Sequence, residues 1–109
     1  MRPTAFGIDD KWSIPCPDAL EWRSWDEEIA LYDERSDEIH YFDVATAAVF
    51  ETLAVKPASM PELATVLADK LEVQVDGELA RMVAEIVRML HEKQIIAVTS
   101  PGREAADFH

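Results

Sequence analysis

Histidine and cysteine are the side chains of this sequence that most readily bind metals or attack substrates. The three histidines are His40, His91 and His109, and the single cysteine is Cys16. No histidine has a second ligand at the i+4 spacing that would place two metal ligands on one face of a helix. Cys16 lies between two prolines with no neighbouring group that would lower its pKa, so we interpret it as an inert thiol. These residues predict neither a metal site nor a cysteine nucleophile.

Carboxylates, glycines and serines give no better catalytic pattern. The acidic pairs Asp9-Asp10 and Glu27-Glu28 are adjacent in the sequence, whereas acid–base catalysis needs two carboxylates that face each other. The glycines at positions 7, 77 and 102 are too far apart to form a phosphate-binding loop. No serine stands in a nucleophile elbow. We therefore predict a protein that is not an enzyme and has no cofactor.

The charge of the chain restricts its partners. Its 109 residues suffice for one domain, and 22 acidic residues against 10 basic ones give a formal net charge of −12. A field of this sign repels phosphate backbones and anionic lipid headgroups, so we expect neither nucleic acid nor membrane as a partner. The segment at positions 1–12 has one arginine and no apolar core, which predicts a cytoplasmic location rather than secretion.

Three short strands are predicted before position 43. Apolar and polar residues alternate over Leu20–Trp25, Glu28–Asp33 and Glu38–Phe42, with turns at 26–27 and 34–37. The two tryptophans of the first strand, Trp22 and Trp25, prevent a clean assignment of its faces. In the third strand both faces are partly apolar, and which of them meets the rest of the protein stays open.

Three helices follow, each with a capping signal. Asp43 can cap a helix over Val44–Val55, and the capping box Ser59-Met60-Pro61-Glu62 begins a second helix over about 60–71. Asp76 can cap a third helix, from Gly77 to about Lys93. Positions 95–99 are apolar and β-branched, which fits a short closing strand or an extended tail.

The third predicted helix is apolar over about half of its circumference, more than the roughly 100° that a core-facing helix needs. Leu79, Val83, Ile86 and Leu90 lie near the centre of this apolar arc and are core candidates. Met82 and Met89 lie at its edge. Methionines at such a margin can fill gaps in the core, or they can line an adaptable peptide groove.

Strands followed by helices define an α+β fold, a three-stranded antiparallel sheet followed by three helices. We expect an irregular N-terminal arm at 1–18, the folded domain at 19–99 and a disordered tail at 100–109. A winged-helix regulatory module that binds DNA or protein would give the same order of elements. The acidic charge favours protein over DNA as its partner.

The third strand and its flanks carry a family resemblance. The segment Ser36-Asp37-Glu38-Ile39-His40-Tyr41-Phe42-Asp43, with the alanine-rich helix after it, resembles the PqqD family of peptide chaperones. The branch to which it is most similar is that of the HPr-rel-A system. Trp22 and Trp25 also stand where that pattern has tryptophans, and the resemblance extends over about 12–98. Asp37 and Gln94 replace glycines of the family, so we expect a differently shaped exit from the third helix.

The resemblance implies a RiPP recognition element with a winged-helix-like fold. It implies that the leader of a ribosomal precursor peptide adds as a strand to the third strand, and that the protein presents this peptide to a modifying enzyme. The implied peptide-binding residues are Glu38, Ile39, His40, Tyr41 and Phe42 of the strand, with Met82, Ile86 and Met89 of the third helix. The exposed strand edge also makes a homodimer possible. A structural subunit of a larger enzyme complex is a further alternative.

Overall fold

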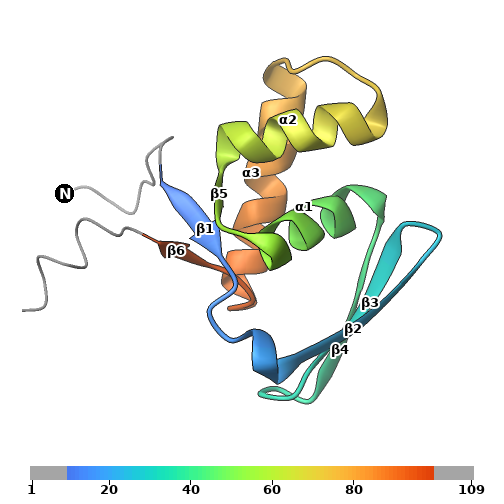
Figure 1. Ribbon diagram of the computed structural model, residues 1–109, viewed down its shortest axis with the longest axis vertical. Coiled ribbons are helices and arrows are strands. Elements are labelled where there is room, and N and C mark those ends of the chain that lie inside the picture. Colours follow the sequence, from blue (N-terminus) through green and yellow to red (C-terminus); the bar gives the residue numbers. More distant parts are fainter. Residues whose placement is uncertain (1–9, 100–109) are drawn as a thin grey trace, which may run out of the picture.

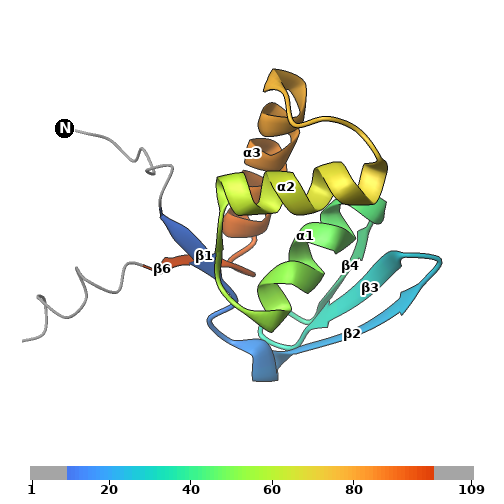
Figure 2. The same cartoon turned by 45° about the horizontal axis from the view of Figure 1, so that its top comes forward.

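The computed structural model describes residues 10–99, and its larger sheet is antiparallel with the strand order β2-β3-β4. The strands β2 (Leu20–Trp25), β3 (Glu28–Asp33) and β4 (Glu38–Phe42) have the predicted bounds. One face of this sheet is covered by helices and the other is open (Figures 1 and 2). The predicted fold class, α+β with a three-stranded antiparallel sheet and three helices, is confirmed.

The first hairpin turn fixes the register of the sheet. Asp26 and Glu27 both have positive φ, 50° and 67°, as in the two-residue turns whose twist matches that of a hairpin. Trp25 therefore pairs with Glu28, and Trp22 pairs with Leu31. Because side chains alternate along a strand, the two tryptophans lie on opposite faces, which settles the assignment that the sequence left open.

The three helices begin at the predicted caps. The side chain of Asp43 accepts from the backbone of α1 (Val44–Val55), and Asp76 does the same for α3 (Gly77–Glu92). The helix α2 (Met60–Leu71) begins with the full capping box of Ser59 and Glu62. Each cap satisfies backbone amides that have no partner within the helix, so these polar residues define where the helices start.

The exit from α3 is not reshaped as expected. Gln94 adopts φ 63°, the left-handed conformation that glycine usually provides. The backbone of Gln94 donates to the carbonyl of His91, and that of Ile95 donates to the carbonyl of Leu90, which together form a Schellman motif. Ile95 and Leu90 are both buried, so the apolar contact of this motif holds a glutamine in a strained conformation.

The core lies between the larger sheet and the helices. β3 contributes Ile29 and Leu31, which are fully buried, and α1 contributes Phe50, whose ring is 4.8 Å from that of Trp22 and 5.7 Å from that of Phe42. The four core candidates of α3 are all buried: Leu79, Val83, Ile86 and Leu90. The centre of the apolar arc of α3 therefore packs inward as predicted.

The N-terminal segment differs from the irregular arm that we expected. Lys11–Ser13 forms β1, which pairs with β5 (Ala58–Ser59) and with β6 (Ala97–Thr99) in a second sheet at the other end of the molecule (Figure 1). Trp12 is only 1% exposed. A short 3-10 helix, Pro17–Ala19, then leads into β2. The prediction of an irregular arm is therefore wrong for residues 11–13. Backbone pairing and the buried indole of Trp12 attach these residues to the folded domain.

The expected disordered tail, 100–109, lies outside the described residues, as do positions 1–9 of the expected arm. Within residues 10–99, no helix has the length and apolar character needed to cross a bilayer. The segment at 95–99 ends in the predicted closing strand, since β6 covers Ala97–Thr99, and Ile95 and Ile96 are buried before it begins.

Candidate functional site

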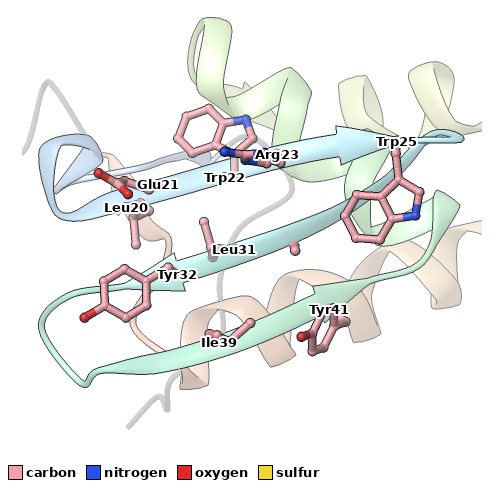
Figure 3. Close-up of a pocket in the computed structure, with 10 residues that line it drawn as sticks. Leu20, Glu21, Trp22, Arg23, Trp25, Leu31, Tyr32, Ile39 and Tyr41 are labelled. Carbon is pink, nitrogen blue, oxygen red and sulfur yellow. The ribbon is translucent and has the colours of Figure 1, made fainter.

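β4 is an end strand of the larger sheet. Its only pairing within the described residues is with β3, from Ile29 opposite Phe42 to Asp33 opposite Glu38. The other edge of β4 therefore keeps backbone donors and acceptors that a further strand could pair with. In Figure 3, which looks onto the open face of the sheet, the pale orange α3 passes behind β4.

The two faces of β4 differ in burial. Phe42 is 4% exposed and packs towards Phe50, and His40 is half-buried on the same face. Ile39 and Tyr41 point away from the helices and are 57% and 74% exposed. The face of the third strand that meets the helices is thus the one with Glu38, His40 and Phe42.

An ion pair at the end of the sheet ties its second hairpin to α3. Arg35 Nε and Nη2 donate to the two carboxylate oxygens of Asp33, each at 2.9 Å, and Arg35 Nη2 also donates to the Gln94 carbonyl at 2.9 Å. Asp33 is 3% exposed. The hydrogen bonds from the Arg35 side chain lower the pKa of the Asp33 carboxyl, so this buried group is ionised at neutral pH. The pair fixes the start of β4 relative to the end of α3.

A second contact holds the same hairpin from the open face. The Tyr32 hydroxyl donates to Asp37 Oδ1 at 2.7 Å, and this hydrogen bond raises the pKa of Tyr32. Asp37 has φ 61°, the left-handed conformation that glycine usually provides. The aspartate thus serves both the turn and the tyrosine, which a glycine could not do.

The α3 residues predicted for the peptide site have different environments. Ile86 is 8% exposed and belongs to the core, and Met89 is half-buried against it. Met82 is 38% exposed. Of the three, Met82 therefore has the most surface available to a ligand, while Ile86 is chiefly a core residue. Their role beside β4 stays a prediction, as does the role of the β4 residues themselves.

The structure also has a hollow that sequence reasoning missed. It lies on the open face of the larger sheet and has a volume of about 600 Å³, and residues of all three strands line it (Figure 3). Its lining consists of Leu20, Glu21, Trp22, Arg23, Trp25, Ala30, Leu31, Tyr32, Ile39 and Tyr41. The signal that could have found it is the two-residue turn at 26–27, because this turn sets which side chains of β2 and β3 share a face.

Metal-binding groups do not gather in the described part of the chain. Among residues 10–99, no three histidine, cysteine or acidic side chains are placed to hold a metal ion. His40 Nε2 lies 3.6 Å from Glu38 Oε1, and the His91 ring stacks edge-on with Trp12 at 5.3 Å. Cys16 is exposed. His109 lies outside the described residues.

Comparison with known proteins gives a likeness of fold. No family model matches the chain, and no curated protein matches its sequence. A solved structure of TbiB1 in complex with the TbiA(beta) leader peptide is similar, with a TM-score of 0.65 over 81% of this chain and 98% of that one. The two sequences are 19% identical, so the likeness shows a shared fold. The resemblance to the PqqD family stays a prediction.

Proposed function

We propose that this protein binds the leader of a ribosomal precursor peptide by strand addition along β4, and presents it to a peptide-modifying enzyme without catalysing a reaction itself. The observation that carries the proposal is the edge of β4 that no strand of residues 10–99 pairs with, in front of α3 in Figure 3, in a fold shared with a protein that was solved with a leader peptide bound. An extended peptide needs such an edge, because backbone hydrogen bonds supply much of its affinity.

The geometry of β4 determines how an added strand would lie. Side chains of an extended peptide alternate, so one set would point towards α3 and the other outward beside Ile39 and Tyr41. Met82 and Met89 would contact the inward set, since thioether side chains adapt to different partners. Ile86 would form the floor beneath them. His40 and Phe42 would keep β4 in place by packing against the helices.

Three further expectations accompany this proposal. The modifying enzyme would act on the peptide while its leader is bound to β4. We expect this protein to carry out that role in the cytoplasm. A homodimer formed through two β4 edges would occupy the peptide site, so we expect dimer and leader to compete. The net charge of −12 supports a peptide over nucleic acid as the ligand.

The proposal is tested with a synthetic leader of a precursor peptide encoded beside this protein. In an NMR titration we expect amide shifts to concentrate in β4 and α3. Two further leaders carry N-methyl groups, one at the odd and one at the even positions of the binding segment. Only one set of amides can face β4, so one leader should bind about a hundredfold more weakly, at roughly 1 kcal/mol per lost hydrogen bond, and the other should bind normally.

Equal affinity of the two N-methylated leaders would exclude strand addition. Shifts centred away from β4 and α3 would exclude the site while leaving peptide binding intact. The matched protein control is Val55→Ser, which changes an exposed valine (82%) at the end of α1 and should leave leader binding unchanged.

A further inference from the structure

The open face of the larger sheet, here called the outer face, exposes a group of large apolar side chains. Trp25 is 48% exposed, Ile39 57% and Tyr41 74%, and they come from the two outer strands. Ala30 and Tyr32 of β3 lie between them, because Ala30 pairs with Tyr41 and Tyr32 pairs with Ile39. Figure 3 shows Trp25, Tyr32, Ile39 and Tyr41 among the side chains that line the hollow.

Such a surface costs solubility, since folded monomers rarely leave large contiguous apolar patches open to water. Tryptophan and tyrosine are also the residues most enriched where proteins bind one another. The packing of the sheet does not explain why large apolar side chains are exposed on the outer face, because the core is formed by side chains of the inner face alone. The outer face thus has the composition of a contact surface.

The charges around the outer face decide which partner fits. Glu28 pairs with Trp25 and Glu21 pairs with Tyr32, so both carboxylates share the face with the aromatic rings. Asp37 lies beside Tyr32 at its end. Arg23 is the single cationic side chain in the lining of the hollow. The rim is therefore mainly negative, in a chain whose formal charge is −12.

From this arrangement we infer that the outer face docks a second protein whose contact surface is apolar at the centre and carries arginine or lysine at its margin. Guanidinium or ammonium groups would lie over the rings of Trp25 and Tyr41 and pair with Glu21 and Glu28. Apolar groups would fill the hollow above Ala30 and Ile39. A second copy of this chain fits poorly, since it would bring one acidic rim against another.

This docking surface goes beyond the proposed peptide site and uses different atoms of β4. The peptide would bond to the backbone along the free edge, whereas the partner protein would contact the outward side chains. The two sites can also fail separately, because side-chain substitutions on the outer face leave the backbone edge intact.

The test uses a peptoid with guanidinium and isobutyl side chains as the probe. A peptoid has no backbone N–H, so it cannot form the ladder of a paired strand along the edge of β4. In NMR titrations of the full chain, we expect shifts of the Trp25 indole N–H and of the Ile39 methyl groups. A matched peptoid with carboxylate side chains should cause none.

Variants of the protein locate the contact. The double variant Ile39→Ser/Tyr41→Ser should weaken peptoid binding about fivefold, through loss of a cation–π contact and of apolar area. Glu21→Gln/Glu28→Gln should weaken it about threefold, and more at low salt than at high salt. The control Val55→Ser/Val75→Ser removes exposed apolar side chains elsewhere and should change nothing. Circular dichroism of each variant checks that the fold is retained.

Three results would overturn the docking surface: no binding of the guanidinium peptoid, equal binding of the carboxylate peptoid, or equal losses in the control variant. None of them bears on leader binding. If the N-methylated leaders still discriminate while the peptoid fails, the proposed function stands and the docking surface does not. If the peptoid binds the outer face while the leaders show no discrimination, the reverse holds.

Discussion

The two faces of the β2–β3–β4 sheet have similar side chains and opposite surroundings. On the inner face Ile29 and Leu31 are fully buried beneath the helices, while on the outer face Ile39 and Tyr41 are largely exposed. Successive side chains of a strand point to opposite faces, and both faces of this sheet carry apolar side chains. The type of a residue therefore says little about which face it belongs to. The inner face therefore stabilises the fold, whereas the outer face leaves large side chains exposed to solvent.

Substitutions on the two faces of the sheet should differ strongly in the free energy of unfolding. Leu31→Ala removes a side chain that is 0% exposed and should lower the free energy of unfolding by about 2–5 kcal/mol. Ile39→Ala removes an exposed one and should cost no more than about 0.5–1 kcal/mol. Urea denaturation of both variants measures the contrast. Similar losses would mean that the outer face is part of the core, contrary to its proposed role.

An intermediate effect concerns the buried ion pair at the end of the inner face. Arg35→Met leaves the Asp33 carboxylate buried without its cation, with only the backbone N–H of residue 35 still donating to Oδ1, and should cost about 3 kcal/mol at neutral pH. Because Arg35 lowers the folded-state pKa of Asp33, the wild-type contribution is complete above the unfolded value of 3.8. It is lost as the pH falls from 3.8 through the lower folded pKa.

Denaturation of the wild type and Arg35→Met across this pH range gives the readout. The gap between the two proteins should narrow as the pH falls towards the lowered folded-state pKa of Asp33, because protonated Asp33 no longer needs the cation. Arg81→Met is the control, since this arginine is exposed on α3 and its loss should give a small difference. A gap that is constant with pH would show that Arg35 stabilises the hairpin by packing rather than by charge.

The smallest change in stability is expected at Gln94, whose carbonyl accepts from Arg35 just after α3. Gln94→Gly should raise stability by about 1 kcal/mol, because glycine adopts φ 63° without the strain of a side chain. The Gln94 carbonyl still accepts from Arg35 in this variant, so the link to the inner face is retained. Glu72→Gly, at φ 59° after α2, should gain a similar amount and serves as the comparison. Thermal denaturation measures both, and a loss at Gln94 alone would mean that its side chain has a stabilising contact.

The sequence predicted most elements of this fold because their ends carry polar signals. Asp43, Asp76 and the Ser59-Glu62 capping box each bond to the backbone within a few residues, so local sequence decides where a helix begins. The three strands of the larger sheet are joined by short turns, and their bounds were predicted correctly for the same reason.

The features that could not be predicted from the sequence depend on contacts between residues distant in the chain. Lys11–Ser13 is a strand only because Ala58–Ser59 and Ala97–Thr99 lie beside it, and three residues carry too little periodicity to show this. Gln94 keeps a glycine-like conformation because Ile95 is anchored in the core. The outer face could not be predicted because both faces of β4 are partly apolar, and only the packing of Phe42 against the helices decides that Ile39 and Tyr41 point outward.

The pairing of β1 with β6 has a mechanical consequence. Lys11 lies opposite Thr99, so the first residue of β1 and the last residue of β6 stand together where the two strands leave the sheet. Tension applied at this end of both strands would break the backbone hydrogen bonds between β1 and β6 one after another, instead of all at once. The Ser13–Thr99 hydroxyl contact, at 2.7 Å, would break early, and the buried Trp12 would be extracted later. A pulling force would thus fray the small sheet while β4 and the helices stay folded.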